Sequence, residues 1–361
     1  MKTTRIFASQ AVPGMVVAED VYTFNNQMII AAGTTLDDKM ITRMKFYSVA
    51  TIIVNKEETA DPVAAPAVDP IVSDATKATP EFQYYKTELP VAINTLKTEV
   101  HHLVTSPVSN VDQNALLKSV SRLLKKSRNG IHVFDMLHCL RDLNDQTFAH
   151  SINVALICYV IGSWLGFSRK ELETLTLGGI LHDIGKVTLP PELILKPTKL
   201  TDDEYETIKT HSVRGYNILR EKEVDNHVKF AAMMHHERCD GSGYPMGLKA
   251  DQIDSHAKIV AIADVYEAMT SARVYRNAVC PFEVLHILED EGMTKYDTQY
   301  LMCFLEHLTL SYINSNVRLS NGMEGKIVML NQHSLSRPVV KCGRKYIDLS
   351  TERNIFIVEM L

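Results

Sequence analysis

The sequence predicts a mainly α protein, with a helical core, a small α/β unit near the amino terminus and a short β segment near the carboxyl terminus. Three observations support this. From residue 81 to about 313, apolar residues recur at spacings of three and four, as on helix faces. Before residue 56 and after residue 316 the apolar runs are short and strand-like. Residues 57–80 are rich in Ala, Pro, Asp and Thr, which is typical of a linker.

The apolar pattern of the first 56 residues predicts a small β-β-α-β domain. The pattern does not indicate the role of this domain. Residues 14–21 (GMVVAEDV) and 27–32 (QMIIAA) are β-like runs, a helix is expected over 36–47, and a last strand over 51–54.

The helical domain is expected over residues 81–315, followed by a β cap over 316–361. Proline and glycine lie between the helical segments, where helices should end. After residue 316 the runs KIVML, KYIDL and IFIVEM predict strands.

Composition excludes several classes of protein. The 361 residues are 45% apolar and 22% charged, as in globular proteins, and the net charge of -5 argues against binding of a nucleic acid polymer. The sequence shows neither a membrane-spanning run nor the apolar stretch of a signal peptide. The six cysteines lack C-x-x-C pairing, so we expect reduced thiols and a cytoplasmic protein.

Five histidines and two aspartates lie where helices are expected to begin or end, several of them as His beside a carboxylate. They are His150, His182, Asp183, His211, His235, His236 and Asp264. Imidazole with carboxylate suits divalent Mn, Fe, Co, Ni or Zn. Because a single catalytic metal needs about three protein ligands, seven predict two ions with a bridging carboxylate, for which we select Asp183.

Two metal ions of this kind favour phosphoester hydrolysis, because they activate a bridging water and hold both oxygens of a displacement at phosphorus. Lys186 lies one turn after His182 and could stabilise a phosphate or protonate the leaving oxygen. Arg273 and Arg276 follow Asp264 and could contact phosphate in bidentate fashion. The alternatives are that Lys186 only complements a helix dipole and that both arginines are surface residues.

The stretch HHERCDGSGYP, residues 235–245, combines two of these histidines with a tight turn. Gly241 and Gly243 are expected to supply positive φ angles, and Tyr244 before Pro245 should be extended. We expect Glu237 to orient a neighbouring imidazole rather than to bind metal. Tyr244 could contact a base, but a structural or partner-docking role is the preferred reading.

Three motifs resemble, in order and spacing, the HD-GYP family of the HD phosphohydrolase superfamily: HDIGK at 182–186, HHERCDGSGYP at 235–245 and DVYEAMTSARVYR at 264–276. The resemblance covers about residues 130–335. It implies an all-helical HD core, hydrolysis of the bacterial messenger cyclic di-GMP to pGpG and often on to GMP, and a two- or three-metal centre. It also implies the same seven ligands, with Lys186, Arg273 and Arg276 holding the substrate phosphates.

The sequence departs from the family pattern at three positions. Family members with a third metal resemble one another in a Glu one turn before the first His, and this position is Gln146 here. We therefore expect two ions, with Fe or Mn preferred and Co, Ni or Zn as alternatives. Glu267 replaces an Asp and keeps its charge, whereas Val274 replaces a Pro and frees the backbone between the two arginines.

The leading hypothesis is a metal-dependent phosphodiesterase that cleaves cyclic di-GMP with a metal-bridging hydroxide. The alternatives are a catalytically weak cyclic-dinucleotide receptor or signalling scaffold, and an HD phosphohydrolase that acts on another cyclic dinucleotide or a phosphomonoester. Protein partners could dock at the GYP loop or the amino-terminal domain, and a homodimer is left open, as are the base selectivity and the final product.

Overall fold

The computed structural model describes most of the helical region and parts of the amino-terminal region. The described residues are 3–7, 11–22, 28–37, 40–41, 44, 51–55, 79–106, 110–125, 127, 133–134, 136–137, 146–196, 198, 200–271, 279–352 and 354–361. The chain divides into two compact units. The first holds residues 1–70, 191–208 and 273–277, and the second holds the rest.

The first unit contains two antiparallel strand pairs. β1 (Thr3–Phe7) pairs with β4 (Thr51–Asn55), and β2 (Val21–Tyr22) pairs with β3 (Met28–Ile30). The strand expected over 14–21 was largely wrong, because this segment forms turns and only isolated bridges at Val16 and Val17. Val17 nevertheless enters the core of the unit, where it packs among buried residues from the paired strands.

Sequence patterns missed β1, since TTRIF has only two apolar residues and no alternation. Of the helix expected over 36–47, the described residues Met40, Ile41 and Met44 are helical. Two short helices, α8 (Pro191–Ile194) and α9 (Asp202–Lys209), belong to or border this unit, and Lys196 pairs with Glu204 within it.

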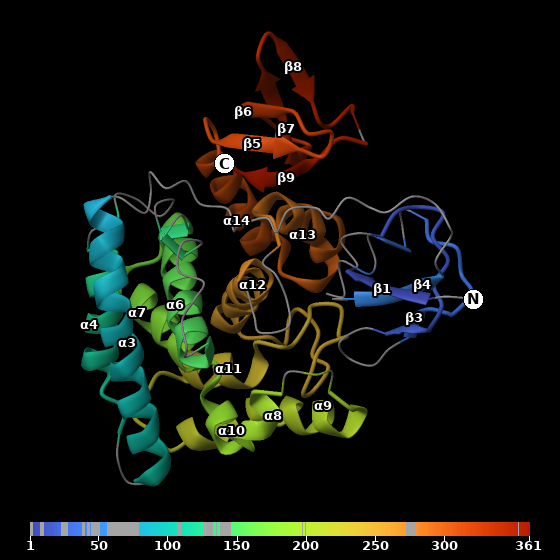
Figure 1. The fold of residues 1–361 in the computed structure, drawn as a ribbon. Helices are drawn as coiled ribbons and strands as arrows, with labels where there is room; N and C mark the ends of the chain where they lie inside the picture. Colours follow the sequence, from blue (N-terminus) through green and yellow to red (C-terminus); the bar gives the residue numbers. More distant parts are fainter. Residues whose placement is uncertain are drawn as a thin grey trace. The chain divides into compact units, whose positions relative to one another are not determined.

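The second unit is built from helices, which confirms the mainly α class (Figure 1). They are α3 (Pro80–Thr105), α4 (Gln113–Leu124), α6 (Gln146–Trp164), α7 (Arg169–Leu181), the 3-10 helix η2 (Ile184–Thr188), α10 (His211–Leu219), α11 (Asn226–Met234), α12 (Ser255–Thr270), α13 (Pro281–Lys295) and α14 (Thr298–Ser311). Side chains cap several of their starts: Ser168 and Glu171 form a capping box on α7, and Asp225 and Asp254 cap α11 and α12.

Four of these helices form a closed ring of contacts, in which α6 packs on α7, α7 on α11, α11 on α12, and α12 back on α6. The close approach of α6 and α7 depends on Gly179, where an added Cβ would lie 2.8 Å from the Ala155 Cα. Helix α6 is apolar enough to cross a membrane over Thr147–Trp164, but 72% of that window is buried in the protein. Its composition is therefore that of a core helix.

A five-stranded antiparallel sheet follows the helices and confirms the carboxyl-terminal β segment. Its order is β8 (Lys345–Asp348), β7 (Ser334–Cys342), β6 (Glu324–Asn331), β5 (Asn316–Leu319) and β9 (Ile357–Met360). Glu289 on α13 accepts hydrogen bonds from the backbone N–H groups of Leu335 and Ser336, which attaches β7 to the helices. The domain boundaries at 56, 80 and 315 remain a prediction.

Candidate metal centre

The ring of four helices, with η2 and α10, brings all seven predicted ligands into one cluster. His150 lies in the first turns of α6, His182 caps the end of α7, Asp183 precedes η2, and His211 begins α10. His235 and His236 follow the last residue of α11, and Asp264 lies within α12. All seven side chains are buried or nearly so, and His236 is the most exposed at 19% of its side chain.

The seven residues form two subsets, each able to surround one ion. In each subset, ligand atoms from all members lie within 4.8 Å of one another. The first subset is Asp183, His211, His235 and His236, and the second is His150, His182 and Asp264.

Asp183 lies between the two subsets and turns one carboxylate oxygen toward each. Its Oδ1 is 3.3 Å from His211 Nε2 and 3.7 Å from His235 Nε2. Its Oδ2 is 3.4 Å from His182 Nε2 and 3.7 Å from His150 Nε2. This is the arrangement that a carboxylate bridge between two ions requires.

Asp264 also approaches members of both subsets. Its Oδ1 lies 3.0 Å from His150 Nε2, and its Oδ2 lies 4.0 Å from His236 Nδ1.

Backbone carbonyls fix which ring nitrogen of two histidines faces the cluster. The Nδ1–H of His182 donates to the Gly179 carbonyl at 2.7 Å, and the Nδ1–H of His235 donates to the Ala231 carbonyl at 2.9 Å. Because a carbonyl only accepts, these bonds leave both Nε2 atoms unprotonated and able to bind a metal. Among the described residues, the buried His182 Nε2 and Asp183 Oδ1 have no hydrogen-bond partner, as expected of atoms that bind an ion.

Glu267 orients the third imidazole, a role that the sequence analysis did not assign to it. It is buried, and its Oε2 accepts a short hydrogen bond from His150 Nδ1. Its Oε1 accepts from Asn153 Nδ2 at 3.0 Å and from Ser271 Oγ at 2.7 Å. The signal was its position three residues after Asp264 on the same helix, which places both carboxylates on one face.

The electrostatics of the cluster favour the ligand forms of most of its members. Burial alone would raise the pKa of Asp183 and Asp264, but neighbouring positive charges hold both pKa values well below the usual range. Burial holds the pKa values of His235 and His236 well below that of free histidine. These residues therefore present carboxylates and neutral imidazoles, the forms that bind divalent metals.

His150 differs in its protonation. Burial disfavours its charged form, but Glu267 and Asp264 together outweigh that effect and raise its pKa to about 9. Metal binding at His150 must therefore displace a proton from this imidazole.

The HDIGK segment brings a cation to the bridging carboxylate. Lys186 Nζ lies 2.5 Å from Asp183 Oδ2, and the lysine side chain is 21% exposed, so it reaches the cluster from its solvent side. Gly185 permits this geometry, because an added Cβ would overlap the carbonyl oxygen of His211. The absent side chain allows η2 and α10 to approach until Asp183 faces His211.

The loop after His236 is held by contacts that differ from our expectation. Gly241 has the expected positive φ of 80°, but the φ angle of Gly243 is not positive. Gly243 is required for space instead, since a Cβ there would overlap the backbone of residues 236–238. Glu237 does not orient an imidazole: its two oxygens accept from the N–H groups of Met246 and Leu248 at 2.7 and 2.9 Å.

Tyr244 packs directly on the cluster. Its ring stacks on the His236 ring with centroids 4.6 Å apart, and Lys209 Nζ lies 5.5 Å from the Tyr244 ring centroid. The Tyr244–Pro245 peptide bond is cis.

Several predicted residues fall outside the described part of the chain. Arg273, Val274 and Arg276 are not described, and nor is the side chain of Gln146. The phosphate contacts and the argument for two ions thus stay predictions.

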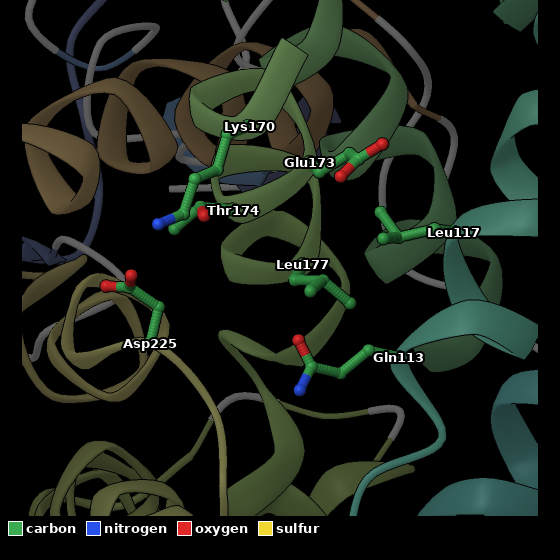
Figure 2. A pocket seen from close by; sticks show the side chains of 7 residues that line it. All are labelled: Gln113, Leu117, Lys170, Glu173, Thr174, Leu177 and Asp225. Carbon is green, nitrogen blue, oxygen red and sulfur yellow. The ribbon is translucent and has the colours of Figure 1, made fainter.

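A surface pocket with a volume of about 270 Å³ lies apart from the seven residues (Figure 2). It is lined by side chains from α4, α7 and the start of α11: Gln113, Leu117, Lys170, Glu173, Thr174, Leu177 and Asp225. None of the predicted ligands lines it.

Comparison with known proteins agrees with the fold and the motifs. A family model described as HD domain matches residues 115–300. A cyclic di-GMP phosphodiesterase of Pseudomonas aeruginosa is 32% identical over 203 residues, covering 56% of this chain and 49% of that protein. A 3'3'-cGAMP-specific phosphodiesterase of Vibrio cholerae is 42% identical over 145 residues, covering 40% of this chain and 34% of that protein.

A solved structure shares the fold. It is a Bdellovibrio bacteriovorus protein described as an HDG"Y"P protein, which aligns with a TM-score of 0.53 at 16% identity over 85% of this chain and 99% of its own. The chain spans about half of the Pseudomonas relative and a third of the Vibrio one. With the HD domain model matched over half of its length and the HDIGK and GYP motifs in place, the chain belongs to the HD domain family and, within it, to the HD-GYP family.

Proposed function

We propose that this protein is a metal-dependent phosphodiesterase that hydrolyses cyclic di-GMP to the linear dinucleotide pGpG, with GMP formed where the linear product is cleaved again. The observation that carries the proposal is Asp183, whose two oxygens each face a separate set of imidazoles. A carboxylate in this position suits a pair of ions, for which we propose Fe or Mn, with Co, Ni or Zn as alternatives.

The site residues have distinct tasks in this reaction. We assign the seven clustered side chains as ligands of two divalent ions, which would lower the pKa of a bound water and offset phosphate charge. Glu267 and the carbonyls of Gly179 and Ala231 hold three of the imidazoles in fixed orientations. Such fixed orientations let the site stabilise charge in the transition state without reorganising during the reaction.

Lys186 is assigned to the phosphate. Its ammonium group already lies beside Asp183 and is partly open to solvent, so a bound phosphodiester can share that charge. The N–H groups of the lysine are hydrogen-bond donors, so Lys186 can also deliver a proton to the leaving oxygen. We assign Arg273 and Arg276 to the other phosphate oxygens, as the family motif implies.

The names of the relatives support a cyclic dinucleotide as substrate. One relative is named for cyclic di-GMP and another for 3'3'-cGAMP. The second name, on the relative with the higher identity, makes a mixed guanine-adenine dinucleotide the alternative substrate. In line with five cysteines that form no disulfide among the described residues, we place the protein in the cytoplasm.

The test is turnover by the purified protein loaded with Mn or Fe under reducing conditions. Cyclic di-GMP, 3'3'-cGAMP and cyclic di-AMP are supplied separately, and the linear products are separated by chromatography. We expect pGpG from cyclic di-GMP, its loss in Asp183→Ala, and normal turnover in the exposed control His101→Ala. Metal-loaded protein that binds cyclic di-GMP but leaves it intact would instead establish a receptor, and faster cleavage of 3'3'-cGAMP would reassign the substrate.

A further inference from the structure

We propose that His227, Asp254 and His256 form a second, separate metal site, which binds one divalent transition-metal ion such as Zn²⁺ where helices α11 and α12 begin. Ligand atoms of these three side chains lie within 4.8 Å of one another. None of the three belongs to the seven-residue cluster, and no family motif quoted above includes them. We call this group the His227 cluster.

Asp254 is already fixed with one oxygen turned toward a histidine. Its Oδ1 caps α12 by accepting from the backbone N–H groups of His256 and Ala257 at 2.9 and 3.2 Å. Its Oδ2 lies 2.7 Å from His227 Nδ1. The capping bonds hold the carboxylate in place, so Oδ2 remains available as a metal ligand whose position varies little.

His256 supplies a buried nitrogen that needs a partner. The residue is 6% exposed, and its Nε2 is buried without a hydrogen-bond partner within the described chain. Its other ring nitrogen lies 3.3 Å from Ser255 Oγ. Because a buried polar nitrogen left unpaired costs free energy, an ion that binds there would offset a cost already present in the fold.

The surroundings favour a cation. The rings of His227 and His256 stack with centroids 4.1 Å apart, and the carboxylates of Asp225 and Glu171 also act on His256. Burial, followed by the charge of His227, lowers the pKa of His256 and keeps its imidazole neutral at pH 7. A neutral imidazole is the form in which histidine binds a divalent ion.

The donor set indicates the class of ion. Two imidazoles and one carboxylate suit Zn²⁺, Co²⁺, Ni²⁺ or Cu²⁺ and match Mg²⁺ or Ca²⁺ poorly. Three protein ligands leave room for a water molecule, and His227, whose side chain is 43% exposed, can turn to complete the coordination.

The position of the His227 cluster gives the ion a structural task. His227 on α11 precedes His235, just beyond the end of that helix, by eight residues, and His256 precedes Asp264 by eight residues on α12. At a rise of 1.5 Å per residue, the His227 cluster lies about 12 Å along the helix pair from the catalytic cluster. An ion there would join the first turns of α11 and α12. Further along these two helices, or just beyond the end of α11, lie three of the seven proposed ligands, His235, His236 and Asp264.

This site also changes how a metal count should be read. Three ions per chain could mean a trinuclear centre or a dinuclear centre plus the His227 cluster. Only the second case predicts that a substitution about 12 Å away from the centre removes one ion and leaves turnover intact.

The test uses full-length protein saturated with Zn²⁺, dialysed, and analysed for zinc per chain by mass spectrometry. We expect His256→Gln and His227→Gln each to contain one ion fewer than the wild type, and the exposed control His101→Gln to keep the wild-type content. Added Zn²⁺ should raise the melting temperature of the wild type more than that of either variant.

Equal zinc content in the wild type and both variants would overturn the proposal. If His256→Gln fails to fold, the half-exposed His227→Gln decides alone. The zinc count does not depend on turnover, so failure of the proposed function would leave this test unaffected.

Discussion

The two ends of the helix pair α11 and α12 carry the same residue types but differ in how those residues are held. At the catalytic end, His235 is fully buried, and its Nδ1 is fixed by a backbone carbonyl. At the other end, His227 is half exposed, and its Nδ1 faces Asp254. If one end is the proposed reaction centre and the other the proposed structural site, then burial and ring orientation distinguish them, and the pairing of histidine with carboxylate does not.

The largest expected effect is a loss of turnover that a substitution at the catalytic end causes and a matched substitution at the other end does not. Asp183→Asn keeps the size of the proposed bridge but removes its charge, so we expect turnover to fall on the order of 10⁴-fold, as when one member of a catalytic unit is lost. Metal content at the catalytic end should fall as well. The matched control is Asp254→Asn, because Asn also caps helices well, and it should turn over substrate like the wild type. Equal losses in the two variants would contradict the separation of the sites.

The next largest effect is a loss of stability when the close contact between η2 and α10 is disturbed. Gly185→Ala forces a Cβ against the His211 carbonyl, so we expect it to lower the free energy of unfolding by about 3 kcal/mol and to weaken metal binding. Its control is Gly215→Ala, on the facing side of the same contact, where the nearest atom to the added Cβ is 3.3 Å away. Thermal unfolding of both variants measures the difference, and similar losses would show that the contact is not specific.

A smaller effect is expected from Glu267→Gln. A glutamine oxygen cannot accept from His150, Asn153 and Ser271 together, because its NH₂ group must face one of these donors. We expect metal affinity or turnover to fall about 10- to 100-fold, measured by titration with Mn²⁺ and by initial rates. Glu173→Gln, at an exposed pair with Arg169, should change neither quantity.

The last expected effect is a pH dependence of the stability of the metal-free protein. His235 and His236 have pKa values below that of the unfolded chain, so the unfolded state binds more protons as the pH falls below about 6.5. Stability should then fall by up to about 1.4 kcal/mol per pH unit for each histidine. His150 acts oppositely, since its raised pKa stabilises the fold below about 6.5 and that contribution is lost as the pH rises through about 9.

Urea unfolding in the presence of a chelator, between pH 8 and pH 5, measures this dependence. His236→Asn should reduce the acid slope, because it removes one of the two neutral imidazoles. Stability that is constant from pH 6.5 to 5 would contradict the buried, neutral state of these residues.

The clustering of the seven residues could be predicted from sequence because they occur in short motifs at helix ends. HDIGK alone contains two of the proposed ligands and the adjacent lysine. Glu267 escaped assignment since its task depends on α6 packing against α12, a contact between residues more than 100 positions apart. Glu237 was assigned the wrong partner for a similar reason. Its carboxylate oxygens accept hydrogen bonds from backbone N–H groups nine and eleven residues later, in a loop whose path depends on tertiary contacts.

The amino-terminal unit shows where sequence patterns carry less information. Its strands have two to five residues, too short for alternation to fix their limits. β1 and β4 pair across almost 50 residues of chain, so neither strand is defined by its neighbours in sequence.

Anomalous diffraction from a crystal of the Mn- or Fe-loaded protein locates the metal ions and so tests the proposed metal centre most directly. Two ions bridged by Asp183 should give two peaks roughly 3.5–4 Å apart, with one Asp183 oxygen at each. A single peak in the catalytic cluster, or two peaks that Asp183 does not connect, would contradict this arrangement.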